Sequence, residues 1–207
     1  MPNNRKFWNK AAEKYSKSPI ADQESYEIKL DITRDYFTPE SEVLEVGCGT
    51  GSTAILHAPY VKHIHGVDIS DTMIEIARQK LKPGVHDNIS FEVADLVTYP
   101  RTGKMYDVIL ALSIVHLIED RAALLKMIYD RLKPGGTFVS STVCLKLYSP
   151  LIRILLPIGR AFGQVPTVVS IDPAGLQKDM TDSGFKIVHQ WQPGPKKAVF
   201  LICQKPG

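Results

Sequence analysis

Cysteine is scarce in this chain, with only three in 207 residues. Cys48, Cys144 and Cys203 lie too far apart to form the short spacings that are typical of metal sites, so no metal site is predicted. An odd number of cysteines is typical of reduced thiols, and the protein is therefore expected to be cytoplasmic.

Long apolar runs are also missing, and no apolar stretch approaches the roughly 20 residues needed to cross a membrane. The N-terminus is polar and lacks the features of a secretory signal peptide, so no integral membrane segment is expected. A net charge of +3 is too small to indicate nucleic acid as an obligatory partner. Composition and length fit one domain with a sizeable core, residues 1–207.

A short buried strand that runs into three glycines is the most informative stretch of the sequence. The strand is predicted over residues 43–46, the glycines are Gly47, Gly49 and Gly51, and a helix can open over residues 52–58. This order is typical of a nucleotide-binding turn, because glycines let a ligand approach the backbone. The N-terminus of the helix adds N–H groups and a positive dipole end.

The spacing of the glycines narrows the choice of possible ligands. A dinucleotide fingerprint would place its third glycine at position 52, where this chain has Ser52. An acid, Glu45, lies two residues before the first glycine. Glu-x-Gly-x-Gly-x-Gly resembles the first motif of class I S-adenosylmethionine-dependent methyltransferases. The resemblance implies S-adenosylmethionine as the cofactor, with its amino-acid part lying over the loop of residues 47–51.

Acids end the next two predicted strands. Asp68 follows the strand over residues 63–67, where a carboxylate can accept both hydroxyls of a ribose. The alternative is a helix cap, a role that Ser70 can fill instead. Asp95 follows the strand over residues 89–94, and the resemblance implies that it accepts a hydrogen bond from the adenine amino group. A turn or capping role is the alternative for Asp95.

Strands and helices alternate from Val43 onward, which predicts a parallel sheet covered on both faces. Only a short loop separates the last two strands, so they should pair as an antiparallel hairpin. The fold class is therefore α/β, a Rossmann-like three-layer sandwich with a seven-stranded, mostly parallel sheet. The four later strands are predicted at residues 106–112, 137–143, 185–191 and 198–204.

Residues 1–40 are predicted to form an N-terminal helical cap. Phe7, Trp8 and Tyr15 fall at helical spacing, in a pattern that resembles the opening helix of small-molecule methyltransferases. We expect Phe7 and Trp8 to pack on the core, and Tyr15 to contact the cofactor or the substrate.

The segment of residues 145–169 is predicted to be an apolar lid. It is rich in Leu, Ile and Pro, carries Lys146, Arg153 and Arg160, and contains no acid before position 170. A helix is plausible near residues 150–156. The alternatives are a surface excursion that buries itself against the domain and, more weakly, contact with a membrane surface.

The resemblance implies that the end of the fourth strand faces the methyl group. His116 lies just beyond that strand and can titrate near neutrality, so it is the candidate general base. It can equally pack between helix and sheet or contact the cofactor. The predicted cofactor-binding residues are Tyr15, Gly47, Cys48, Gly49, Gly51, Asp68, Ile69, Met73, Asp95, Leu96 and Leu112.

The predicted function is methyl transfer to O, N, C or S of a small, apolar or aromatic molecule, as in the subgroup that methylates quinone precursors. Nucleic acid is not the expected acceptor, because residues 111–114 read Ala-Leu-Ser-Ile where some relatives have Asn/Asp-Pro-Pro-Tyr. A protein side chain is the second choice. A non-catalytic cofactor-binding or partner module and a dinucleotide-dependent oxidoreductase are the alternatives.

Overall fold

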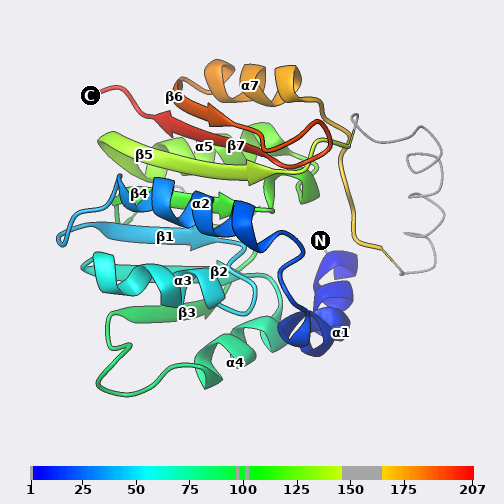
Figure 1. The fold of residues 1–207 in the computed structure, drawn as a ribbon, viewed down its shortest axis with the longest axis vertical. Coiled ribbons are helices and arrows are strands. Elements are labelled where there is room, and N and C mark those ends of the chain that lie inside the picture. Colours follow the sequence, from blue (N-terminus) through cyan, green and yellow to red (C-terminus); the bar gives the residue numbers. More distant parts are fainter. Residues whose placement is uncertain (1, 97, 101–102, 146–164) are drawn as a thin grey trace.

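The computed structural model describes residues 2–96, 98–100, 103–145 and 165–207. Within these ranges seven strands form one sheet (Figure 1). The strands are β1 (Glu42–Val46), β2 (His63–Asp68), β3 (Ile89–Val93), β4 (Tyr106–Leu112), β5 (Leu132–Thr142), β6 (Lys186–Trp191) and β7 (Val199–Gln204). Their order is β3-β2-β1-β4-β5-β7-β6. β1 to β5 run parallel, and β7 is antiparallel to both β5 and β6, so the predicted fold class and hairpin are confirmed.

Helices precede and connect the strands. They are α1 (Pro2–Lys17), α2 (Gln23–Arg34), α3 (Ser52–His57), α4 (Asp71–Gln79), α5 (Arg121–Arg131) and α7 (Pro173–Asp182), with short 3₁₀ turns η1 (Ala58–Tyr60) and η2 (Val115–Leu117). α2, α4, α5 and α7 each begin after a residue whose side chain accepts a hydrogen bond from the first turn. These capping residues, Asp22, Ser70, Asp120 and Asp172, satisfy backbone N–H groups that the helix itself leaves unpaired.

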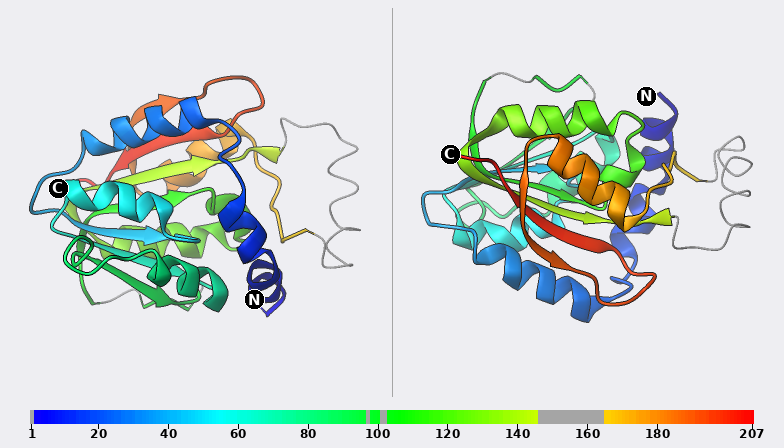
Figure 2. Two further views of the ribbon diagram at one scale, coloured as in Figure 1. Left: turned by 60° about the horizontal axis from the view of Figure 1, so that its bottom comes forward. Right: turned by 90° about the horizontal axis from the view of Figure 1, so that it is seen from above.

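The sheet separates two apolar layers. In β4, Val108 and Leu110 pack in the layer shared with α3 and α4, whereas Ile109 and Ala111 pack in the layer shared with α5 and α7. The view from above shows α5 and α7 on one side of the sheet and α2 on the other (Figure 2). Burial on both faces explains why β4 reads as a continuous apolar run.

Several element boundaries differ from the sequence prediction. The strand predicted over residues 137–143 begins earlier, at Leu132, because Tyr106 pairs with Leu132 and Val108 with Thr137 across a register shift. The helix predicted over residues 52–58 ends at His57, and Pro59 lies in the 3₁₀ turn η1 that follows. A proline lacks only the N–H donor, which the first turn of a helix does not need.

The connection between β3 and β4 has no helix in its described part, so the alternation of strands and helices is incomplete. A buried arginine, Arg131, holds this connection instead. Its guanidinium donates to the carbonyl oxygens of Pro100 at 2.7 Å and Lys104 at 2.8 Å, and lies 5.4 Å from the centre of the Tyr106 ring. The charge is buried at low cost because its donors are paired and it stacks on an aromatic face.

Most of the predicted lid at residues 145–169, with the helix predicted near 150–156, lies outside the described residues. In the described part of the chain no helix is long and apolar enough to cross a membrane.

Candidate functional site

The glycine turn lies between β1 and α3 and is tied to β2. The N–H groups of Gly47 and Cys48 both donate to the carbonyl oxygen of Val67, at 2.8 and 3.0 Å. Gly47, Gly49 and Gly51 have φ angles of +70°, +53° and +72°, in the left-handed region that favours glycine. The turn therefore depends on glycine backbone angles at alternate positions.

Only one of these glycines has open space where a side chain would stand. A Cβ on Gly47 would lie 2.7 Å from Cγ1 of Ile114, and one on Gly51 would lie 2.5 Å from Cζ of Phe91. A Cβ on Gly49 would meet only the ring of Tyr15, at 3.9 Å. The sequence argument that all three glycines make way for a ligand thus fits Gly49, while the other two make way for protein side chains.

Asp68 joins the glycine turn to the start of α4. Its Oδ2 accepts from the N–H of Gly49 at 3.0 Å and its Oδ1 from the N–H of Ser70 at 2.9 Å. Only 9% of Asp68 is exposed, and burial raises its pKa against the effect of these hydrogen bonds. Asp68 also accepts from the backbone N–H of Ile69. A carboxylate has about four lone-pair sites, so Asp68 can still accept a hydrogen bond from a ligand.

Glu45 lies beneath the same turn and is almost completely buried. Burial, and then the charge of Asp68, raise its pKa to about 8. Its Oε2 has no hydrogen-bond partner among the described residues. A buried carboxylate oxygen without a partner is costly, and an ammonium group bound beside the turn would both pair with Oε2 and favour the charged form.

α1 lies across the end of the sheet, next to α4 (Figure 1). Arg5 forms an ion pair with Asp71 in the first turn of α4, and Ser70 Oγ donates to Asn9 Oδ1 at 2.6 Å. These polar contacts are to α4, while Phe7 and Trp8, which we expected to pack on the core, are partly buried. The arrangement holds α1 over the site.

An aromatic row along α1 leads to Tyr15. The rings of Phe7 and Trp8 meet edge to face at 5.1 Å, and those of Trp8 and Tyr15 at 6.2 Å. Tyr15 is 55% exposed. Partial burial nevertheless raises the pKa of its phenol, and the nearby carboxylates of Glu45 and Asp68 raise it further. Tyr15 lies beside Gly49, 3.9 Å from where a Cβ on that residue would stand.

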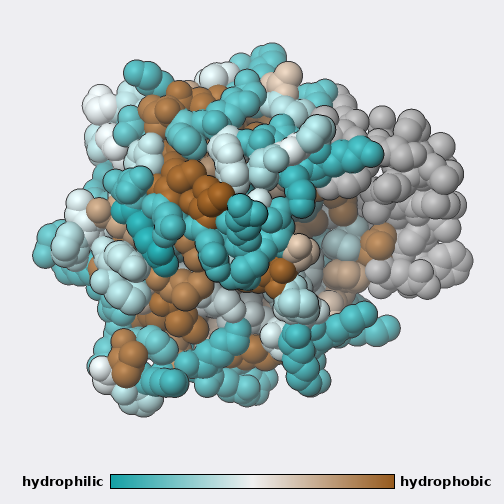
Figure 3. All heavy atoms as spheres, in the orientation of Figure 1, coloured by the Kyte–Doolittle hydropathy of each residue, from teal (hydrophilic) through white to brown (hydrophobic). Residues whose placement is uncertain are grey.

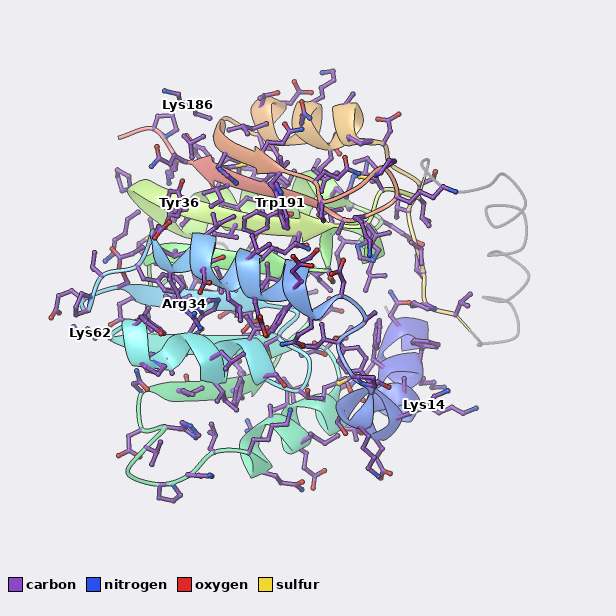
Figure 4. All side chains as sticks on the ribbon, in the orientation of Figure 1. Lys14, Arg34, Tyr36, Lys62, Lys186 and Trp191 are labelled. Atoms are coloured by element: carbon purple, nitrogen blue, oxygen red, sulfur yellow. The ribbon has the colours of Figure 1, made fainter. Side chains whose placement is uncertain are left out.

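A cavity of about 610 Å³ opens beside the glycine turn. Its wall comes from the α1–α2 connection, the inner side of α2, the turn, the ends of β4 and β5 and the β6–β7 loop. Hydrophilic side chains surround separate apolar patches on this face of the molecule (Figure 3). Tyr36 and Trp191 pack against the apolar layer on the same side of the sheet (Figure 4). The volume suits one small molecule.

Ser113 follows β4 and lies on the cavity wall. It has a φ of +63°, the only positive value at a non-glycine residue in the described ranges. Such a conformation costs about 1–3 kcal/mol and persists only where its surroundings impose it. Here the N–H of Ser113 donates to the carbonyl oxygen of Ser141 at 2.7 Å, and the next residue, Ile114, covers Gly47. The sequence carries no signal for this strain.

The predicted cofactor residues fall into three groups in the structure: those that line the cavity, those at the turn and the nearby strand ends, and those that are buried. Tyr15, Cys48 and Leu112 line the cavity. The glycines and Asp68 form the turn already described, and Ile69 and Asp95 are partly buried close by, at the ends of β2 and β3. Met73 and Leu96 are buried, and with 2% exposure Met73 is placed as a core residue.

His116 lies in η2 and is 9% exposed. Burial lowers its pKa to about 4, and its Nδ1 has no partner among the described residues. His116 is not among the described residues that line the cavity. Its backbone carbonyl oxygen accepts from the N–H of Val169 at 2.8 Å, which anchors the last residue of the predicted lid.

Two residues on the cavity wall were missed by sequence reasoning. His57, to which no role was assigned, is completely buried, meets Phe37 edge to face at 5.0 Å and lines the cavity. Burial lowers its pKa to about 3. Lys29 reaches the wall from the middle of α2. In the described ranges no three His, Cys, Asp or Glu residues are placed to hold a metal ion.

A seven-stranded sheet of this order, with a glycine turn after β1 and acids at the ends of β2 and β3, defines the class I methyltransferase fold. Residues 43–136 match the family described as "Methyltransferase domain". Over these residues the chain is therefore similar to methyltransferases.

Known proteins that are similar to this chain are methyltransferases by name. Phosphoethanolamine N-methyltransferase 1 from Zea mays is 36% identical over 107 residues, which are 51% of this chain and 21% of that protein. Malonyl-acyl-carrier-protein O-methyltransferase 1 from Ilyobacter polytropus is 32% identical over 162 residues, 77% of this chain and 58% of that protein. The chain therefore spans between about a fifth and three fifths of the length of these relatives.

A solved structure shares the fold over almost its whole length. Magnesium protoporphyrin IX methyltransferase from Synechocystis, with bound S-adenosylhomocysteine, has a TM-score of 0.72, 19% identity and 97% coverage of both chains. At this identity the likeness shows the fold alone.

Proposed function

We propose that this protein transfers a methyl group from S-adenosylmethionine to a small acceptor bound in the cavity. The observation that carries the proposal is that two features occur together at the end of β1. There is open space at Gly49, and the buried Oε2 of Glu45 has no hydrogen-bond partner among the described residues. Both features fit a ligand with an ammonium group lying against the turn. Ligands of open α/β sheets bind at this carboxyl end of the strands.

The cofactor would be held by residues of three strand ends. Glu45 would pair with its ammonium group, Asp68 with the ribose hydroxyls and Asp95 with the adenine amino group, while Tyr15 would cover the amino-acid part. When bound, its sulfonium supplies an electrophilic methyl group. We further propose that residues 1–40 and 145–169 act as cap and lid over this site.

The chain's own contribution is alignment and exclusion of water. Leu112 and Ser113 lie where the end of β4 meets the cavity, so they would position the acceptor's O, N, C or S atom. Three buried free thiols fit a role in the cytoplasm. We propose a small molecule rather than nucleic acid as the acceptor because the cavity is about 610 Å³.

We infer that His116 packs rather than acts as a base. A buried imidazole with a pKa of about 4 is neutral at pH 7 and is a weak base. Replacing His116 by glutamine should therefore change the turnover number less than about threefold and lower the free energy of unfolding by about 1 kcal/mol. Denaturant titration and a methyl-transfer assay would measure both. A turnover loss of about 100-fold with unchanged stability would restore the catalytic role.

Calorimetric titration with S-adenosylmethionine, S-adenosylhomocysteine and NAD tests the proposed function. We expect both sulfur nucleosides to bind and NAD not to bind. Binding of NAD alone would favour an oxidoreductase. If the nucleosides bind but a panel of phenols, acids and amines yields no S-adenosylhomocysteine, a non-catalytic module takes first place.

A further inference from the structure

Lys29 occupies an unusual position on the inner side of α2. Tyr26, Lys29, Leu30 and Thr33 follow the helical repeat that places side chains on one face, and Leu30 and Thr33 are buried. The Nζ of Lys29 donates to Oγ of Ser141 in β5 at 3.1 Å. A positive charge therefore stands on the buried side of a helix, at the wall of the cavity.

No carboxylate pairs with this lysine. Ser141 is its hydrogen-bond partner among the described residues. Asp22 is near enough to favour the charged form, but Asp22 itself accepts from the N–H of Ser25 at 3.2 Å and from Lys197 Nζ at 2.8 Å. Residues 146–164 contain no Asp or Glu, so they offer no carboxylate either. Burial accordingly lowers the pKa of Lys29.

The cavity as a whole carries an excess of positive charge. Its described wall includes Lys29, Lys196 and Lys197, and Asp22 is the one carboxylate there. A cation that has lost water without gaining a counter-charge favours an anionic ligand. The hydroxyl of Ser141, next to Nζ, adds a hydrogen-bond donor for such a group.

We propose that the methyl acceptor carries an anionic group, a carboxylate or a phosphate monoester, which Lys29 and Ser141 bind. This inference rests on the proposed function and narrows its substrate class from any small apolar or aromatic molecule to one with an acidic group. The anion would anchor one end of the acceptor at β5, leaving the nucleophilic atom to face Ser113 at the end of β4. Lys29 is then a specificity-determining residue.

Matched ligands test the proposal. Benzoate, phenyl phosphate and neutral benzamide would be titrated calorimetrically into the wild-type protein, with and without S-adenosylhomocysteine. We expect at least one anion to bind about tenfold or more tightly than benzamide, as for a charged hydrogen bond. Comparison of benzoate with phenyl phosphate identifies the acidic group. Equal affinity for benzamide, or no anion binding at about 10 mM, would overturn the proposal.

Three variants assign the effect to Lys29. Lys29→Met should abolish the preference for anions, whereas Lys29→Arg should keep it, because arginine binds anions but cannot act as a base. Lys178→Met removes an exposed lysine from α7 and should have no effect. Anion binding by Lys29→Met at the wild-type level would contradict the proposal. Loss of the preference in Lys29→Arg as well would also contradict anion binding as the role of this residue.

Titration of the same proteins with S-adenosylhomocysteine separates the two hypotheses. Anion preference without S-adenosylhomocysteine binding would overturn the proposed function alone. Binding of S-adenosylhomocysteine by wild type and Lys29→Met, with no preference for anions in either, would overturn the acidic acceptor alone.

Discussion

Replacing Asp68 by alanine should weaken the binding of S-adenosylhomocysteine by about 100-fold. A hydrogen bond to a charged group contributes about 1.5–3 kcal/mol, and the Asp68 carboxylate, which accepts from three backbone N–H groups, keeps a lone pair for a ribose hydroxyl. The carboxylate is 9% exposed, so water cannot replace it fully. Calorimetric titration of wild type and variant would measure the loss.

The same carboxylate also holds the turn, and the controls must separate the two roles. Alanine leaves the N–H groups of Gly49 and Ser70 without their acceptor, which should lower the free energy of unfolding by about 2 kcal/mol. Asp68→Asn keeps an acceptor oxygen and should recover part of this stability but little of the affinity. Asp130→Asn alters an exposed ion pair in α5 and should change neither quantity. Wild-type affinity in a folded Asp68→Ala protein would refute the ribose role.

The sequence was sufficient to predict the sheet, because its strands are marked by chemistry that is local. β4 is buried on both faces and therefore reads as an unbroken apolar run, and its predicted and observed bounds are both residues 106–112. The short loop before β7 forced a hairpin without any knowledge of tertiary contacts. The acids Asp68 and Asp95 could be placed at strand ends for the same reason.

Features that depend on contacts between distant residues could not be predicted. Lys29 and Ser141 are 112 positions apart, and an inward-facing lysine on α2 looks in the sequence like any solvated charge. The strain at Ser113 arises from neighbouring strands, and serine gives no local sign of it. The docking of α1 on α4 includes an ion pair of Arg5 with Asp71 that periodicity does not encode. Local patterns thus located the glycine turn but missed part of the cavity wall.

Alanine substitutions at two glycines of the turn should have opposite effects. We expect Gly51→Ala to lose stability and Gly49→Ala to lose ligand binding. Gly51→Ala combines a φ of +72° with a Cβ 2.5 Å from Phe91. Left-handed strain of about 1–2 kcal/mol and overpacking of about 1–3 kcal/mol should together lower the free energy of unfolding by about 3 kcal/mol. Denaturant titration would measure this, and Phe91→Leu in the same protein should restore part of it by making room.

Gly49→Ala should instead leave the fold nearly intact and lose the ligand. Its φ of +53° costs about 1 kcal/mol with alanine, and the new Cβ meets only Tyr15 at 3.9 Å. That methyl group would stand where the backbone must be approached closely, so binding of S-adenosylhomocysteine should fall by about 100-fold or more. If Gly49→Ala binds as tightly as wild type, the open space at this glycine is not where the cofactor lies. The reverse result, a large loss of stability at position 49 and a small one at position 51, would show that the turn is packed differently.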